Sequence, residues 1–266
     1  MTAVDWSDVA AHDFQVPANH PLPELVHELS QLLRSPKPEL RDALAYSTLA
    51  TWISRGQLPH RLLVELGDEM AVRFTDPEVQ ARTFAPLVLA VLASDNIVEE
   101  PWIVAFERWW PAEGDVRGYD PVLGWLHAVA HGADLAGELG RCSMVAPGRM
   151  LELVTARMTA QSADVWRDGE DDRVAGAIAH ILTRKDLGLV EATSWLDPLE
   201  NVMRTSGATG TPAAVSNTMR SLRSLYLLLA TGVRVGKDDA AVVPAHATDV
   251  QRRIVEVLHH ATPWMW

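Results

Sequence analysis

The chain has 266 residues, a formal net charge of −12 and 48% hydrophobic residues, so it can bury a sizeable core. An acidic chain without a basic run lacks the clustered Lys and Arg that a nucleic-acid binder needs. The ordinary charged fraction, 22%, and the high apolar fraction exclude disordered and low-complexity classes.

Cysteine usage and the first residues indicate the compartment. Cys142 is the single cysteine, so no disulfide can form within the chain, and a reducing compartment is the simplest interpretation. The start, MTAVDWSDVAAHDF, lacks the regions of a signal peptide, and the longest apolar run, FAPLVLAVLA, is too short to span a bilayer. Arg largely replaces Lys, as in high-GC bacterial genomes, so we predict a bacterial source. Together these features predict a cytoplasmic protein that binds neither membrane nor nucleic acid.

Helical periodicity dominates the first hundred residues. Apolar residues recur three and four positions apart over 19–35, and the next prolines should end that helix. The segment 38–56 predicts a second helix closed by a glycine, and a third begins at Pro59. Asp76 and Pro77 predict the N-cap and the first residue of a fourth helix. Short links between these helices favour antiparallel hairpins.

The same periodicity continues to the end of the chain without a convincing strand. We therefore predict an all-α fold of stacked antiparallel helical hairpins, with an α-solenoid architecture of the HEAT type. Nothing in the composition separates two halves, so a single domain over residues 1–266 is expected.

The segment GYDPVLGWLHAVAHGADLAGELG, residues 118–140, carries ionisable residues at regular spacing. Asp120 precedes a proline and is expected to be the N-cap of a helix. Wound at about 100° per residue, that helix would place five ionisable side chains in a sector about 60° wide. They are Asp120, His127, His131, Asp134 and Glu138. The segment predicts an ionisable stripe on one helix face.

The stripe could bind a metal ion. His127 and His131 are four residues apart, which puts both imidazoles within reach of one ion. Asp134 would add an oxygen ligand or fix a histidine tautomer, and zinc, iron or manganese suits such ligands. Two alternatives stay open. One is a structural network of hydrogen-bonded core groups, which is the commoner use of such residues, and the other is a metal-free active site.

The loop EGDVRGYD, residues 113–120, adds catalytic candidates before the stripe. Asp115 and Asp120 would complete the site with carboxylates, and Arg117 would hold an anionic substrate group. The competing interpretation is that these charges only pin adjacent helices together.

Aromatic side chains crowd the same region. Trp110, Tyr119 and Trp125 are candidates for the wall of a substrate pocket, and Arg82 is a further substrate-binding candidate. Tryptophan also fills wide gaps between packed helices, and apolar residues at helical spacing are core more often than binding sites. A pocket and an ordinary core therefore both explain these residues.

The chain resembles the bacterial family known as domain of unknown function 2785, most specifically in EGDVRGYDPVLGWLHAVAHGADL. Its pattern is also similar in LRSPKPELRDALAYSTLATWI, ARTFAPLVLAVLASDN and DRVAGAIAHILTRKDL. The resemblance covers about residues 30–200, and C-terminal helices at about 211–266 are expected to pack on that part. It implies a helical protein whose family motif positions include Asp115, Arg117, Asp120, His127, His131 and Asp134. It implies no activity, substrate or cofactor.

Two functional hypotheses follow. The first is an enzyme or metal-binding protein that acts on a small molecule through His127, His131, Asp134 and the 113–120 loop. The second is a non-catalytic helical-repeat module, in which the stripe stiffens a scaffold and a concave face holds a peptide or protein. The first needs both histidines in a reachable pocket, whereas the second pairs their ring nitrogens with protein groups.

Overall fold

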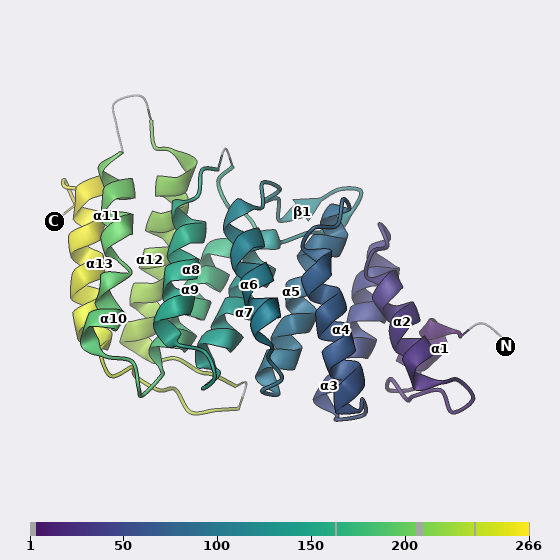
Figure 1. The fold of residues 1–266 in the computed structure, drawn as a ribbon. Coiled ribbons are helices and arrows are strands. Elements are labelled where there is room, and N and C mark those ends of the chain that lie inside the picture. Colours follow the sequence, from purple (N-terminus) through teal and green to yellow (C-terminus); the bar gives the residue numbers. More distant parts are fainter. Residues whose placement is uncertain (1–3, 163, 206–209, 237, 266) are drawn as a thin grey trace. The chain divides into compact units, whose positions relative to one another are not determined.

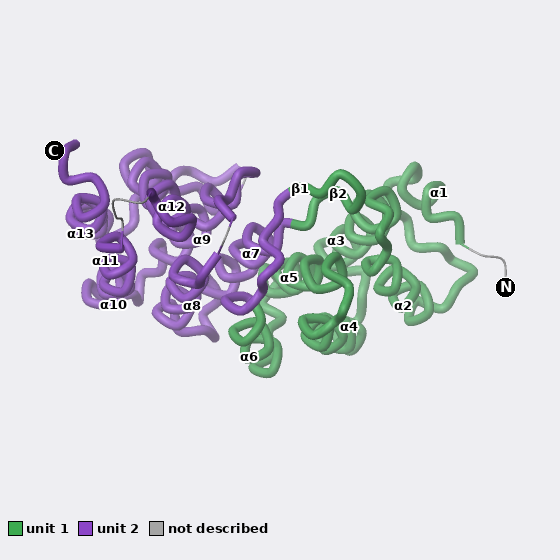
Figure 2. Tube along the Cα trace, turned by 90° about the horizontal axis from the view of Figure 1, so that it is seen from above, with its two compact units in different colours: residues 1–109, 119–126 green, residues 110–118, 127–266 purple. Residues whose placement is uncertain are grey.

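The computed structural model describes residues 4–162, 164–205, 210–236 and 238–265. Most of them lie in helices, so the predicted all-α class is confirmed. The chain divides into two compact units (Figure 2), one of residues 1–109 and 119–126 and one of residues 110–118 and 127–266. Among the described residues, no helix combines the length and the apolar character that crossing a membrane requires.

The first unit is built of helices that lie side by side, with one short hairpin of strands (Figure 1). Its elements are α1 (Trp6–Ala11), α2 (Leu22–Leu32), η1 (Glu39–Tyr46), α3 (Ser47–Ser54), α4 (His60–Arg73), α5 (Val79–Ser94), α6 (Glu100–Trp109), β1 (Tyr119–Asp120) and β2 (Gly124–Trp125). The π-helix η1 runs directly into α3, so a helix does cover most of the predicted segment 38–56. HEAT-like stacking of these helices stays a prediction.

Two predicted helix ends in this unit need correction. α2 ends at Leu32 rather than near Ser35. α5 begins at Val79 after the N-cap residue Glu78, so the N-cap assigned to Asp76 is wrong. The Asp76 carboxylate instead accepts a hydrogen bond from the Glu78 amide at 2.9 Å, in a turn before the helix.

The second unit is also helical. Its elements are η2 (Trp110–Ala112), α7 (Ala128–Arg141), α8 (Pro147–Thr159), α9 (Glu170–Leu182), α10 (Leu189–Ser194), α11 (Asp197–Arg204), α12 (Ala213–Thr231) and α13 (Ala247–Ala261). α7 packs on α9, which also carries α12, and α13 packs on α11 and α12. Gly137 permits the close approach of α7 to α9, since a Cβ at this position would lie 3.2 Å from the Cα of Ala177 in α9.

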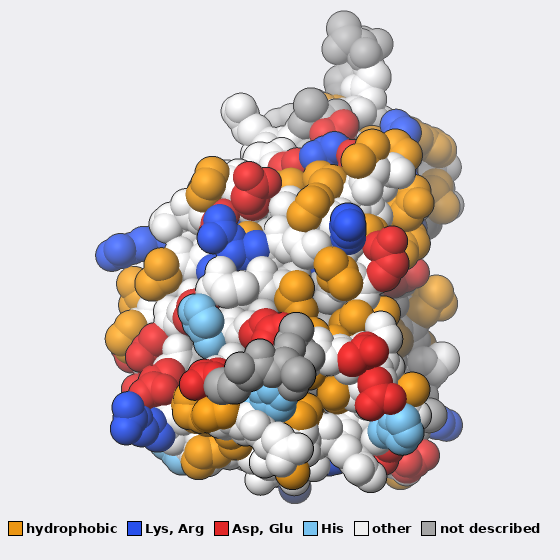
Figure 3. Space-filling view, turned by 90° about the vertical axis from the view of Figure 1, so that its right-hand side faces the viewer, with side chains coloured by type: hydrophobic (Ala, Val, Ile, Leu, Met, Phe, Trp, Pro, Cys, Tyr) orange, Lys and Arg blue, Asp and Glu red, His pale blue; other side chains and the backbone are white. Residues whose placement is uncertain are grey.

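On the face drawn in Figure 3, basic side chains are scattered among acidic, histidine and apolar ones. That the protein binds no nucleic acid stays a prediction from the sequence.

The helix predicted to start after Asp120 is wrong, because residues 119–125 form a hairpin instead. Tyr119 pairs with Trp125, and Asp120 with Gly124, in antiparallel register. The Asp120 carboxylate does accept the next amides, from Val122 at 2.9 Å and from Leu123 at 2.8 Å. The chain then turns back at Gly124, whose φ of +72° lies in the left-handed region that favours glycine.

A buried arginine explains why this turn does not continue as a helix. Arg41 is 0% exposed, and its Nη2 donates to the Leu123 carbonyl at 2.8 Å and to the Trp125 carbonyl at 3.2 Å. In a helix those carbonyls would accept amides four residues further on. Asp42 neutralises the guanidinium at 2.6 Å, and the Phe84 ring covers it at 4.5 Å. Tertiary contacts therefore override the local helix signal.

Two glycines of the second unit give a matched test of this packing. At Gly132 of α7 a Cβ would overlap the Trp110 indole, so Gly132→Ala should lower the free energy of unfolding by about 1–3 kcal/mol. At Gly176 of α9, no described atom outside the local helix backbone lies within 4 Å of the Cβ position, so Gly176→Ala should raise that free energy by up to about 1 kcal/mol. Urea unfolding of the full chain measures both values. Equal effects would contradict the packing described for Trp110.

Candidate functional site

The residues proposed from the sequence are distributed over both units. Trp110, Asp115, Arg117, His127, His131 and Asp134 belong to the second unit, whereas Arg82, Tyr119, Asp120 and Trp125 belong to the first. In the second unit His127 contacts a carboxylate that was not among the proposed residues, Glu170 at the start of α9.

His127 occupies a strained backbone position immediately before α7. Its φ of 52° and ψ of 38° are left-handed, which costs a residue with a side chain about 1–2 kcal/mol. Backbone hydrogen bonds hold it there. The His127 amide donates to the Arg117 carbonyl at 3.1 Å and to the Gly118 carbonyl at 3.3 Å, and the His127 carbonyl accepts the His131 amide at 2.8 Å. The imidazole is thus fixed at the joint between the loop and the helix.

The His127 ring is paired with the buried carboxylate of Glu170. Nδ1 of His127 lies 3.1 Å from Oε1 of Glu170, whose side chain is only 1% exposed. The other carboxylate oxygen accepts the Asp168 amide at 2.8 Å. Burial alone would raise the pKa of Glu170, but the bonds from His127 and from backbone amides outweigh burial and lower that pKa.

This pKa decides the tautomer of His127. An ionised carboxylate only accepts hydrogen bonds, so the hydrogen of the pair must reside on Nδ1 of the imidazole. The remaining ring nitrogen, Nε2, then carries the basic lone pair whenever the imidazole is neutral. A buried carboxylate that orients an imidazole in this way is a recurring arrangement both in acid–base catalysis and behind metal ligands.

The loop before the hairpin is anchored against this pair. A Cβ at Gly118 would overlap the side chains of Asp168 and Glu170, so any larger residue there would displace these carboxylates. At the other end of the loop, buried Arg157 of α8 donates to the Trp110 carbonyl at 2.8 Å and to the Glu113 carbonyl at 2.9 Å. Burial lowers the pKa of Arg157 to about 10, and the nearby Glu113 opposes that shift.

The predicted metal ligands do not form a complete set. The His127 and His131 rings lie edge to face with centroids 5.6 Å apart, and His131 is 8% exposed. Asp134 is held by Arg173, through Nε at 2.7 Å and also through Nη2, while burial raises the pKa of Asp134 against the effect of Arg173. Over the described ranges, no group of three or more His, Cys, Asp and Glu could hold a metal ion. Metal binding stays a prediction.

The other predicted charges make local contacts. Arg117 binds Asp115 through Nε at 2.8 Å and Nη2 at 2.6 Å. Asp120 holds the turn of the hairpin, as described above. Arg82 donates to the Asp76 carbonyl at 2.7 Å and to the Pro77 carbonyl at 3.1 Å, which secures the chain before α5. Each of these residues therefore contributes to local structure.

The aromatic candidates lie in different surroundings. Trp110 is fully buried in the second unit, and its Nε1 donates to the Ala128 carbonyl at 3.1 Å. Tyr119 and Trp125 lie on the hairpin of the first unit, 53% and 45% exposed, with ring centroids 5.0 Å apart. The buried indole supports the start of α7, whereas the hairpin rings are open to solvent.

The sequence does contain a signal for Glu170, although it has an ordinary explanation. The run GEDD at 169–172 is an acidic first turn, which favours a helix start through the helix dipole. Nothing in that pattern shows that the Glu170 side chain turns back to His127, which is 43 residues away. A contact of this range depends on how α7 packs on α9.

The fold and the site define the class: an all-α protein with a histidine–carboxylate pair at a helix start. Residues 70–227, more than half of the chain, match the family described as "Protein of unknown function (DUF2785)", and the chain belongs to that family. The match includes the 113–120 loop, His127 and Glu170. It begins later than the resemblance noted from the sequence, which started at about residue 30, and it extends further toward the C-terminus, so the segment LRSPKPELRDALAYSTLATWI lies outside the match. No curated protein and no solved structure matches the chain.

The lowered pKa of Glu170 predicts how stability depends on pH. A carboxyl whose pKa falls on folding stabilises the folded state above its ordinary pKa, 4.5 for Glu170, and that stability is lost as pH falls through the folded-state pKa. Glu170→Gln should therefore cost about 1–3 kcal/mol at neutral pH, since a buried charged hydrogen bond is lost, and less at about pH 3.

Asp171 provides a control, because its pKa shifts in the direction opposite to that of Glu170. Burial raises the pKa of Asp171 although Arg220 lies 2.9 Å away, so its ionisation opposes folding as pH rises. Relative to Asp171→Asn, the wild type should gain stability as pH falls. Urea unfolding of both variants at neutral and acidic pH checks the two trends, and parallel trends would contradict the assignment of Glu170.

Proposed function

We propose that the protein acts on a small molecule by acid–base chemistry, with His127 as the proton-transferring group and Glu170 as the carboxylate that orients it. The observation that carries this proposal is the 3.1 Å contact between His127 Nδ1 and a carboxylate that is buried and held ionised. This contact fixes one tautomer, so the chemistry belongs to Nε2.

The backbone of His127 supports the proposal independently. A left-handed conformation is most easily adopted by Gly or Asn, and strained positions of this kind cluster at functional sites. The surrounding hydrogen bonds hold His127 there despite the strain. If this position served stability alone, Gly or Asn would suit its left-handed backbone better than His127 does.

The proposed step is a proton transfer. In the neutral imidazole, Nε2 accepts a proton from a hydroxyl group or from water as the new bond to the substrate forms, and Glu170 stabilises the imidazolium that results. The same proton is then available for the leaving group. Hydrolysis of an ester, an amide or a phosphate ester fits this sequence, and the group would contribute about 10²–10⁴-fold in rate.

His127→Asn separates the ring chemistry from the backbone, since Asn tolerates the left-handed conformation. We expect the variant to fold and to lose at least about 100-fold in rate. Glu170→Gln should also lose rate, because the amide no longer selects the tautomer. The assay is a panel of chromogenic esters, amides and phosphate esters. His259→Asn is the control, as His259 is an exposed residue of α13 in the same unit. Equal rates for wild type and His127→Asn on every compound would contradict the proposal.

A second candidate is the non-catalytic scaffold. It is favoured by the pairing of the other candidate charges with protein groups: Asp134 with Arg173, and Asp115 with Arg117. In that case His127→Asn would lower the stability without changing the rate of any reaction. The same variants therefore distinguish the two candidates.

Metal binding by His127 and His131 needs its own test. If His127, His131 and Asp134 bind a metal ion, the purified chain should take up near-stoichiometric zinc, iron or manganese, and Asp134 would have to leave Arg173 to do so. Elemental analysis of the wild type and of a His127→Gln, His131→Gln double variant, after incubation with each ion, measures this uptake. Metal in the wild type that is lost in the double variant would show a metal centre, and no metal in either protein would contradict one.

A further inference from the structure

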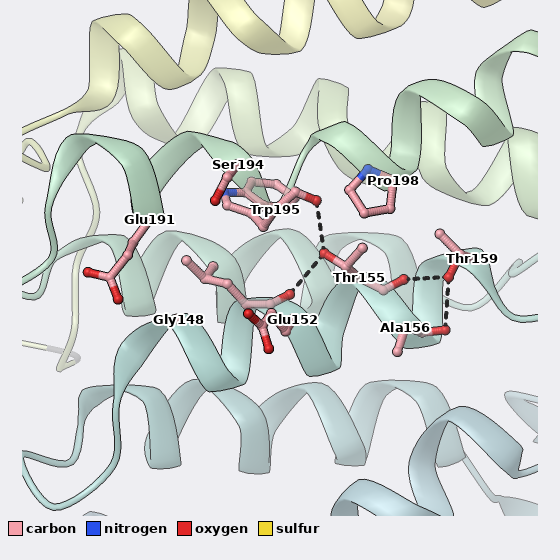
Figure 4. Close-up of a pocket in the computed structure, with 10 residues that line it drawn as sticks. Gly148, Glu152, Thr155, Ala156, Thr159, Glu191, Ser194, Trp195 and Pro198 are labelled. Carbon is pink, nitrogen blue, oxygen red and sulfur yellow. Dashed lines mark hydrogen bonds between the residues drawn. The ribbon is translucent and has the colours of Figure 1, made fainter.

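A groove in the second unit, separate from the His127–Glu170 pair, lies between α8 and the helices α10 and α11. It encloses about 410 Å³, which is within the range of small-molecule sites. Figure 4 shows α8 below the groove and Ser194, Trp195 and Pro198 above it. Segments about forty residues apart in sequence thus form its two sides.

The floor of the groove is largely apolar. Leu151 and Trp195 line it, and both are buried. The one hydroxyl set deep between them, Thr155 Oγ1, lies 2.9 Å from the Leu151 carbonyl and 3.1 Å from the Trp195 carbonyl (Figure 4). Its hydrogen is therefore already engaged. Such a floor fits an apolar part of a ligand, because it offers a polar part few hydrogen-bonding groups.

The rim of the groove is negatively charged. Glu152 of α8 is exposed, and within the described ranges its carboxylate forms no ion pair or hydrogen bond. Glu191 of α10 lies over α8, where a Cβ at Gly148 would be 3.1 Å from its Oε1. Its Oε2 accepts the Gly188 amide at 3.4 Å, which fixes the direction of the carboxylate. The lining residues include no Lys or Arg that would balance these two charges.

We propose that this groove binds a small organic cation, an ammonium or guanidinium group carried on an apolar body. The body would lie against the exposed apolar lining at Ala156 and Pro198, above buried Leu151 and Trp195. The cation would lie at the carboxylates of Glu152 and Glu191. Two carboxylates without a basic partner attract a cation and repel an anion. The volume limits the ligand to a compact molecule. The inference is independent of the proposed function, because it uses none of the residues of the histidine pair.

Tryptamine and tryptophol form a matched pair of probes, because they share the indole-ethyl body and differ in ammonium against hydroxyl. Calorimetric titration of the full chain should show tryptamine binding at least about fivefold more tightly than tryptophol. Added salt should reduce the preference, since the charges at the rim are exposed. Equal affinities, or no tryptamine binding up to about 10 mM, would overturn the proposal.

Substitutions locate the binding in the groove. Glu152→Gln should weaken tryptamine binding at least about fivefold and leave tryptophol unchanged, because only the charge is removed. Asp238→Asn removes one exposed charge of the same unit outside the groove and should change the affinity less than about twofold. Ala156→Trp places a bulky side chain at an exposed lining position and should abolish binding of both probes. Retained binding in Glu152→Gln and Ala156→Trp would assign the probes to another place and overturn the proposal.

His127→Asn separates this inference from the proposed function. That variant should keep full tryptamine affinity, since neither His127 nor Glu170 lines the groove. Failure of the catalytic assay would therefore leave the groove unaffected. Loss of tryptamine binding in His127→Asn would contradict the separation of the two sites.

Discussion

The course of the chain through residues 118–127 depends on a buried guanidinium, that of Arg41. Its Nη2 binds the carbonyls of Leu123 and Trp125, which a helix would otherwise use for its own amides. A charge without solvent access is costly unless it is paired and hydrogen-bonded, and Asp42 and these two carbonyls provide that compensation. The hairpin is therefore a partner that Arg41 needs. Because the hairpin occupies these residues, α7 starts only at Ala128.

That late start gives His127 its particular position. As the residue before the helix, it takes a left-handed backbone, and its amide binds the loop instead of the helix. Its imidazole then meets Glu170, while a glycine at 118 leaves room for the carboxylates. The candidate site thus follows from a helix that begins later than its local sequence favours. Strain of about 1–2 kcal/mol is offset by the bonds around it.

The second unit contains two polar sites, the His127–Glu170 pair and the groove at α8, and their electrostatics differ. At the histidine pair, the carboxylate of Glu170 is buried and balanced by an imidazole and backbone amides. At the groove, Glu152 and Glu191 are exposed, and the described residues that line it include no Lys or Arg. The first arrangement suits the transfer of a proton within a fixed geometry, and the second suits the recognition of a charged ligand. A chain of net charge −12 favours the approach of cations to both.

The sequence by itself determined the all-α class, the helix after Pro59 and the family, because helical periodicity and the motif around residues 113–135 are local signals. It predicted Asp120 as the N-cap of a helix; the Asp120 carboxylate does accept the amides that follow it, but no helix starts there. Only the tertiary structure decided that those amides belong to a hairpin, since Arg41 binds the turn from about eighty residues away. The packing of α7 on α9 likewise decided that Glu170 is the partner of His127. These two residues are 43 positions apart, so no local sequence pattern predicts their contact.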